Sequence, residues 1–135
     1  MINCTFEDGV KTNLRHAVID ALVIKENQIL LIKRASNSYK FPEKIALPGG
    51  YVDLDETVEE AALREVYEET GYRTKIEKFI RFIDAPKRED RQNITFVYLM
   101  SPIQKEKEPD EEVSEIIWTK LNDLPKEEDF AFDHY

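Results

Sequence analysis

Short apolar segments separated by polar residues run through most of this chain. Residues 17–24 form an apolar run of strand length, and residues 29–32 form a second one after four polar residues. Two such runs so close together are typical of a β-hairpin. Residues 79–83 and 94–100 predict two more strands around a charged loop, and residues 116–118 predict a last short strand.

A pattern typical of an α-helix occupies residues 57–70. Thr57 followed three residues later by Glu60 is a capping box, and Thr70-Gly71 is a stop signal. A closing turn or a second short helix is expected after residue 121. Because strands dominate on both sides of the long helix, the pattern predicts one α/β domain over residues 1–135, with a mixed β-sheet flanked by helices.

Three glutamates share one face of the predicted helix. At 3.6 residues per turn, Glu65, Glu68 and Glu69 fall within one arc of about 100°. The same arc holds Val58 and Ala62 in the first turns, so the acidic cluster continues the stripe expected to face the protein body. Buried like charges need a compensating cation, and a divalent ion with oxygen ligands provides one. A solvated, Glu-rich helix face is the alternative, and the helical pattern alone does not decide between them.

Charge is distributed unevenly. The chain has a formal charge of −9, and residues 105–135 hold 4 Lys and 11 Asp or Glu, so −7 of it lies in that segment. Such a balance argues against nucleic acid as a partner, because nucleic-acid binding depends on Lys and Arg that neutralise phosphates. An acidic protein that handles phosphates needs metal cations to bring its substrate in.

Cys4 is the only cysteine, which excludes an intrachain disulfide and a thiolate metal cluster. We interpret it as an inert thiol. No apolar run approaches the ~20 residues that span a bilayer, and the N-terminal residues do not resemble a signal peptide. We therefore expect a cytoplasmic protein without a membrane partner.

A longer motif decides between the two interpretations of the helix. Its members, with apolar Val66 and Tyr72 at the expected places, are Gly50, Glu56, Arg64, Glu65, Glu68, Glu69 and Gly71. They match the Nudix box, G-x5-E-x7-R-E-U-x-E-E-x-G-U, where U is apolar. With this composition the chance of such a match is roughly 10⁻⁶ over the whole chain. The sequence thus resembles the Nudix hydrolase family, as do the Leu47-Pro48-Gly49-Gly50 lead-in and Trp118 with the Leu121–Pro125 turn.

The resemblance implies a fold, a cofactor and roles for residues. The fold is an α/β/α sandwich around a mixed sheet. Glu65, Glu68 and Glu69 would bind Mg²⁺, with Mn²⁺ as the alternative metal, and the Gly50 carbonyl would join them. Arg64 and Glu56 would brace the helix, Arg64 as part of the catalytic set, and Gly71 would serve a structural role.

The proton from the attacking water needs an acceptor carboxylate. Glu68 and Glu65 are candidates within the box. Members of the family also recruit an acid from a loop outside it, and Glu111, Glu112 and Glu115, all shortly before Trp118, are the candidates here. We select Glu115 as the external catalytic residue.

Substrate identity is predicted from two shorter segments. Residues 85–98 and residues 130–134 resemble the corresponding parts of ADP-ribose pyrophosphatases. ADP-ribose, cleaved to AMP and ribose 5-phosphate, is therefore the expected small-molecule nucleotide substrate. The residues expected to grip phosphate or ribose are Arg34, Arg81, Arg88 and Arg91. The alternatives are hydrolysis of nucleoside triphosphates to release pyrophosphate and a non-catalytic nucleotide sensor; homodimers are common in the resembled subgroup.

Overall fold

The computed structural model describes residues 2–38 and 41–130. Its elements follow the chain in this order: β1 (Ile2–Thr5), β2 (Lys11–Leu14), β3 (Ala17–Lys25), β4 (Gln28–Arg34), β5 (Ile45–Ala46), β6 (Gly49–Tyr51), α1 (Val58–Thr70), β7 (Tyr72–Ile83), β8 (Ile94–Lys105), β9 (Val113–Lys120) and the 3₁₀ helix η1 (Glu127–Asp129). The first residue of the chain, residues 39–40 and residues 131–135 lie outside the description, and so does most of the predicted 130–134 segment.

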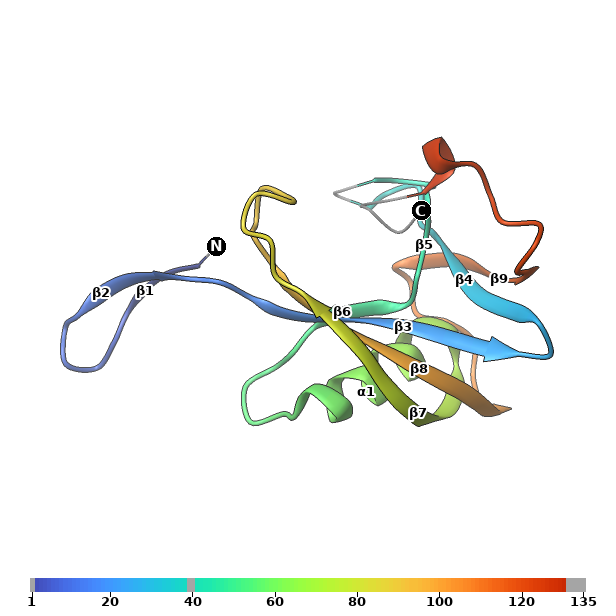
Figure 1. Cartoon of the computed structure of the whole chain (residues 1–135), viewed down its shortest axis with the longest axis horizontal. Helices are drawn as coiled ribbons and strands as arrows, with labels where there is room; N and C mark the ends of the chain where they lie inside the picture. Colours follow the sequence, from blue (N-terminus) through green and yellow to red (C-terminus); the bar gives the residue numbers. More distant parts are fainter. Residues whose placement is uncertain (1, 39–40, 131–135) are drawn as a thin grey trace.

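A seven-stranded mixed sheet forms the body of the molecule (Figure 1). Its main path runs β5-β4-β3-β8-β7, while β6 also pairs with β3 and β9 with β4. The β3–β8 pair is parallel, with Ala17 beside Ile94 and Val23 beside Met100, and the other pairs are antiparallel. The α/β class with a mixed sheet, predicted from the sequence, is confirmed.

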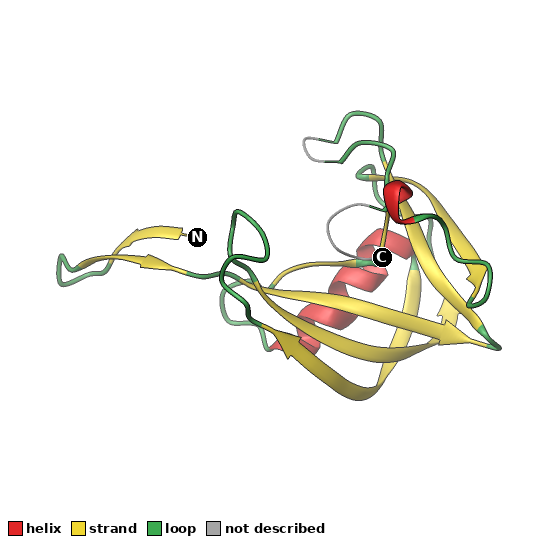
Figure 2. Cartoon of the chain, turned by 45° about the horizontal axis from the view of Figure 1, so that its top comes forward, coloured by secondary structure: helices red, strands yellow, loops and turns green. Residues whose placement is uncertain are grey.

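Helix α1 lies across one face of this sheet (Figure 2). Thr57 and Glu60 form the predicted capping box, and Gly71 ends the helix in the left-handed region with φ 80°. Ala61, Ala62 and Val66 are fully buried against strand residues such as Ile19, Ala21 and Met100. Removing a side chain of this size from water stabilises a fold by roughly 1–3 kcal/mol, so this stripe fixes which face of α1 points inward.

The structure differs from expectation in the number of flanking helices. Among the described residues α1 is the only α-helix, and the segment after residue 121 contributes only the three-residue η1. The second layer of an α/β/α sandwich is thus not present in that part of the chain. No described helix is long and apolar enough to cross a membrane.

Strand β7 is longer than the sequence predicted. It starts at Tyr72, directly after the helix, whereas only residues 79–83 were expected. Its first half alternates charged and apolar residues, and most of its side chains are exposed, so apolar content alone does not reveal it. Pairing with β8 along its whole length stabilises the strand.

Candidate active site

Two of the three clustered glutamates, Glu65 and Glu69, are largely shielded from solvent and line a cavity. Glu69 is only 6% exposed, and its Oε1 accepts a hydrogen bond of 2.7 Å from the backbone N–H of Gly49. The Glu65 side chain is 15% exposed, whereas that of Glu68 is 44% exposed. The interpretation of a solvated helix face therefore fails for Glu65 and Glu69.

Burial makes the charge on these groups costly. It raises the pKa of Glu65 to about 7, although the hydrogen bond from Arg64 opposes this shift. Burial also raises the pKa of Glu69 well above its ordinary value; the N–H of Gly49 opposes the shift, and the nearby carboxylates of Glu65, Asp110 and Glu112 add to it. Such groups lose their charge unless a cation compensates. A divalent ion bound here would therefore stabilise the ionised forms of Glu65 and Glu69.

Gly50 lies against the carboxylate of Glu65. A Cβ at this position would come within 2.5–2.8 Å of the Cδ and both carboxylate oxygens of Glu65. Only glycine allows the carboxylate to lie so close to the backbone of β6. The residues at this point are oxygen donors, the set preferred by Mg²⁺ and other hard cations, so they fit the implied metal.

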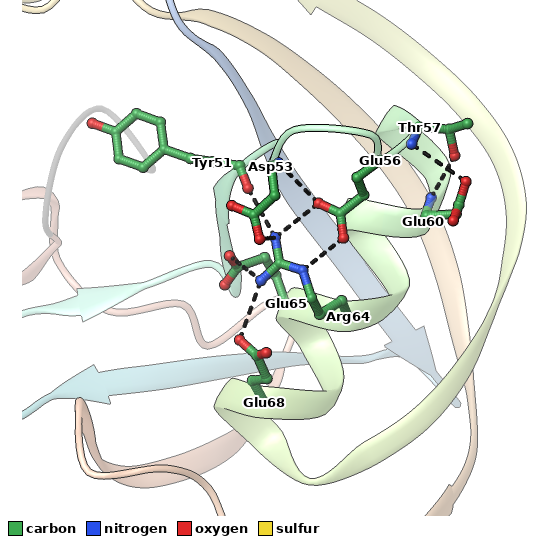
Figure 3. Close-up of polar contacts among 8 residues, drawn as sticks. All are labelled: Tyr51, Asp53, Glu56, Thr57, Glu60, Arg64, Glu65 and Glu68. Carbon is green, nitrogen blue, oxygen red and sulfur yellow. Dashed lines mark hydrogen bonds and ion pairs between the residues drawn. The ribbon is translucent and has the colours of Figure 1, made fainter.

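Arg64 holds the acidic cluster together (Figure 3). Its Nε and Nη2 donate to the two carboxylate oxygens of Glu56 at 2.7 and 3.0 Å. Its Nη1 donates to Glu65 at 2.8 Å and to Glu68 at 3.2 Å, and its Nη2 also donates to the carbonyl of Tyr51 at 3.0 Å. The hydrogen bond from Arg64 lowers the pKa of Glu56, whereas these carboxylates raise that of the guanidinium. Arg64 thus links helix α1 to Glu56 and to the backbone of β6.

In this structure Glu65, Glu68 and Glu69 are not arranged around one point as the ligands of a metal ion would be. Within the described part of the chain, no three Asp, Glu, His or Cys side chains meet around one point at which an ion would be coordinated. Glu65 and Glu68 instead turn toward Arg64 (Figure 3). Metal coordination by all three glutamates requires rotation of these side chains, which the half-exposed Glu68 allows.

A cavity of about 470 Å³ is lined by both acidic and basic residues. Its acidic residues include Glu65 and Glu69 from α1 with Asp53 and Glu112, and Asp20 and Glu89 line it as well. Its basic residues are Arg34 from β4 with Arg88 and Arg91 from the loop between β7 and β8. We call the set Glu65, Glu69, Asp53 and Glu112 the acidic side and the three arginines the basic side, after their charge. The arrangement suits an anionic substrate that is bound through a cation on the first side and through guanidinium groups on the second.

The predicted substrate arginines separate into two groups. Arg34, Arg88 and Arg91 line the cavity, whereas Arg81 lies on the exposed part of β7 and does not. The expectation that Arg81 grips substrate is not supported by its position. Arg88 donates to Thr95 Oγ1 at 2.7 Å and to the Asn93 carbonyl at 3.3 Å, so it also fixes its own loop.

The external acid that the structure places at the cavity is Glu112 rather than Glu115. Glu115 lies within β9, opposite Lys33 of β4, and lines a separate depression together with Ile117 and Pro125. Glu112 precedes β9 in a turn, and its carbonyl accepts from the N–H of Ala35. The position of Glu115 therefore does not support its selection as the external acid, and that of Glu112 favours Glu112. Both residues were candidates from the sequence. They differ in that Glu112 precedes β9, which starts at Val113, whereas Glu115 lies within it.

Tyr51 is a cavity residue that sequence reasoning missed. It directly follows Gly50, and its hydroxyl accepts a short hydrogen bond from Nη1 of Arg91. The Arg91 guanidinium lies 6.0 Å from the ring centroid, and the ring of His16 lies 5.1 Å away. Tyr51 therefore connects the backbone beside the acidic side with the loop of the basic side. The only feature of the sequence that could have pointed to Tyr51 is that it directly follows the Gly49-Gly50 pair.

Comparisons with known proteins agree with this geometry. The family described as "NUDIX domain" matches residues 14–135. An ADP-ribose pyrophosphatase of Methanocaldococcus jannaschii is 40% identical over 117 residues, which cover 86% of this chain and 66% of that protein. A putative 8-oxo-dGTP diphosphatase of Bacillus subtilis is 43% identical over 76 residues, 56% of this chain and 48% of that protein. The chain thus spans between about half and two thirds of these relatives.

Solved structures show the same fold. A NUDIX hydrolase from Nitrosomonas europaea superimposes with a TM-score of 0.80 at 21% identity, covering 96% of this chain and 72% of the other. An ADP-ribose pyrophosphatase from Streptococcus suis gives a TM-score of 0.73 at 21% identity, covering 90% and 83%. At these identities the likeness concerns the fold.

Proposed function

Because the chain belongs to the Nudix hydrolase family, whose members generally need a divalent metal, we propose that it hydrolyses ADP-ribose to AMP and ribose 5-phosphate. The observation that carries the reaction class is the largely buried pair Glu65 and Glu69 in the lining of a cavity that three arginines also line. The 40% identity with the Methanocaldococcus jannaschii enzyme favours ADP-ribose as the substrate.

We propose Glu65, Glu68 and Glu69 as the metal ligands, with the Gly50 carbonyl as a further oxygen donor. Mg²⁺ is the proposed ion and Mn²⁺ the alternative. When bound, the ion would neutralise diphosphate oxygens and lower the pKa of the attacking water. Arg64 would keep the helix and β6 at a fixed separation through Glu56 and the Tyr51 carbonyl, while the carboxylates of Glu65 and Glu68 exchange their contacts with Arg64 for contacts with the ion.

Glu112 is the proposed general base. In the reaction a water oxygen forms a bond to one phosphorus, the bridging P–O bond breaks, and the other phosphate leaves with the bond electrons. Glu112 would take the proton from this water. Its carboxylate belongs to the acidic side and is close enough to Glu65 and Glu69 to raise the pKa of both. The box glutamates would be occupied as ligands, which leaves this role to an acid outside the box.

The basic side is proposed to orient the substrate. Arg91, held over Tyr51, would contact a phosphate. Arg34, at the end of β4, would contact the diphosphate or a ribose. Arg88 would act through the loop that it fixes with Thr95. The cytoplasmic location, the single-domain organisation and the homodimer expected from the sequence stay predictions.

Hydrolysis of a nucleoside triphosphate is the second candidate, because the Bacillus subtilis relative carries the name of an 8-oxo-dGTP diphosphatase. The two candidates differ in products. Incubation with Mg²⁺ and ADP-ribose, sugar nucleotides, diadenosine polyphosphates or nucleoside triphosphates in parallel, followed by chromatography, distinguishes them. AMP and ribose 5-phosphate formed fastest support the proposal; a monophosphate with pyrophosphate formed fastest replaces it by the second candidate.

A further inference from the structure

Arg15 holds the two ends of the loop between β7 and β8 together. It lies in the two-residue junction between β2 and β3. Because β3 and β8 are parallel neighbours, this junction lies beside the loop (Figure 1). Nε of Arg15 donates to the carbonyl of Gln92 at 2.8 Å, and its Nη2 donates to the carbonyl of Asp84 at 2.6 Å. These carbonyls lie near the two ends of the loop of residues 84–93, and the planar guanidinium suits such a two-point contact.

The backbone of the loop needs support at Gln92. Its φ is 54°, in the left-handed region that residues other than glycine rarely adopt. The N–H of Gln92 donates to the carbonyl of Glu89 at 3.1 Å, and the N–H of Arg88 donates to that of Ala85 at 3.3 Å, so the loop contains two tight turns. A residue in this region keeps its conformation only where the surrounding structure holds it. Arg15 provides such a contact from a different part of the chain.

The position of Arg91 depends on the second of these turns. Arg91 directly precedes Gln92, and its side chain lines the cavity and donates to the hydroxyl of Tyr51. The same junction also supports Tyr51, because the ring of His16 lies 5.1 Å from the ring of Tyr51. Arg15 and His16 are consecutive, so two neighbouring residues contact the two structures between which Arg91 is held.

Arg15 itself is set back from the cavity. The described lining of the cavity includes Arg88 and Arg91 of the loop but not Arg15. We propose that Arg15 is a positioning residue, which sets the affinity for substrate by holding the loop, and with it Arg91, at the cavity. This role rests on the proposed function, because it takes the ligand of the loop arginines to be the diphosphate of a nucleotide. Hydrogen bonds to a phosphate are directional, so they weaken when the donor is displaced.

The contacts of Arg15 predict an effect on binding and not on the chemical step. The proposed metal ligands lie on α1, whereas both contacts of Arg15 are with the loop. Loss of these contacts lowers the fraction of molecules whose loop arginines are in place, which weakens apparent affinity by that fraction. KM should therefore rise while kcat stays unchanged.

Steady-state kinetics of the full chain, with Mg²⁺ and the nucleotide that the wild type hydrolyses fastest, tests the proposal. Arg15→Gln loses both charge-assisted hydrogen bonds and should raise KM roughly three- to tenfold at unchanged kcat. Arg15→Lys keeps the charge and one of the two contacts, so its KM should lie between. Lys11→Gln, which removes the same charge from an exposed position of β2, is the matched control and should behave as wild type. Unchanged KM in Arg15→Gln, or a fall in kcat as large as the rise in KM, would overturn the proposal.

A double variant tests whether Arg15 acts through Arg91. In the background of Arg91→Ala, the further change Arg15→Gln should add little to KM, because both changes remove the same contact with substrate. Fully additive increases in KM would show that Arg15 does not act by placing Arg91, and would overturn the proposal.

Hydrogen exchange of the loop amides tests the same role without substrate. The N–H groups of Arg88 and Gln92, which close the two turns, should exchange at least about threefold faster in Arg15→Gln than in wild type and Lys11→Gln, with the amides of α1 unchanged. Equal exchange in Arg15→Gln and wild type would overturn the proposal whatever the enzyme hydrolyses. If exchange and KM respond as expected with another nucleotide but ADP-ribose is not hydrolysed, the proposed substrate is wrong and the role of Arg15 is confirmed. If no nucleotide is hydrolysed, the proposed function and the role of Arg15 are both wrong.

Discussion

The two sides of the cavity are built in different ways. The acidic side is centred on helix α1, where a capping box, a buried apolar stripe and the C-terminal Gly71 fix the position of each glutamate. The basic side depends on the loop between β7 and β8, which is held by side-chain contacts such as Arg88 with Thr95. The proposed metal ligands thus lie on a regular helix, whereas two of the three proposed substrate arginines, Arg88 and Arg91, lie on a loop, where changes of specificity disturb the fold least.

Loss of one proposed metal ligand on helix α1 should have the largest effect. Glu68→Gln removes one negative charge but keeps the shape of the side chain, and it should lower kcat/KM on the order of 10³-fold through loss of several kcal/mol of transition-state stabilisation. Steady-state kinetics with saturating Mg²⁺ measures this. Glu59→Gln, on the exposed first turn of the same helix, is the matched control and should behave as wild type. Undiminished turnover in Glu68→Gln would contradict the assignment of Glu68 as a metal ligand.

A methyl group at Gly50 tests whether the acidic side depends on close backbone approach. Gly50→Ala would place a Cβ 2.5–2.8 Å from carboxylate atoms of Glu65, so this side chain must move. Displacement of a reacting group by about 1 Å can cost about 10²-fold in rate, and we expect a loss of this size in kcat. Wild-type kcat in a folded Gly50→Ala protein, with folding checked by circular dichroism, would show that the contact with Glu65 is not needed.

Arg64 tests the bracing of the acidic side. Lysine keeps the charge but cannot contact Glu56, Glu65 and the Tyr51 carbonyl at once, as the guanidinium does. Arg64→Lys should therefore weaken metal affinity and turnover by roughly 10- to 100-fold, the usual cost of losing support behind a metal site. The apparent metal affinity, obtained from the dependence of rate on Mg²⁺, is the measurement. Equal apparent metal affinities for wild type and Arg64→Lys would show that metal binding does not depend on the contacts of the guanidinium.

Changes on the basic side should be smaller and should affect KM. Arg91→Ala removes the guanidinium that Tyr51 holds, and KM should rise about tenfold with kcat nearly unchanged, as for loss of one charge-assisted hydrogen bond. Tyr51→Phe should raise KM less, and the double variant should not exceed Arg91→Ala, because both act through one contact. Arg81→Ala, outside the cavity, is the control. Additive effects in the double variant would show that Tyr51 does not act through Arg91.

The sequence predicts the parts of the site that depend on local pattern and misses those that depend on tertiary pairing. Helix periodicity places Glu65 and Glu69 on the same arc as the apolar stripe, but only the longer motif favoured an inward acidic cluster over a solvated face. The capping box fixes where the helix begins. The choice between Glu112 and Glu115 depends on the start of β9, which tertiary pairing with β4 determines. The contact between Tyr51 and Arg91 joins residues 40 positions apart, so no local pattern reveals it. The hairpin of β1 and β2 was not predicted, because strands of four residues are too short to show a clear alternation of apolar and polar residues.

The glutamates of α1 are proposed to hold a divalent ion beside the cavity. Titration of Mn²⁺, followed by the loss of its free-ion electron paramagnetic resonance signal, tests this claim without any assumption about substrate. Wild type should bind Mn²⁺, Glu65→Gln should bind it at least tenfold more weakly, about 1.4 kcal/mol, and Glu115→Gln, in the separate depression, should bind it as wild type does. Equal binding by wild type and Glu65→Gln would contradict the account.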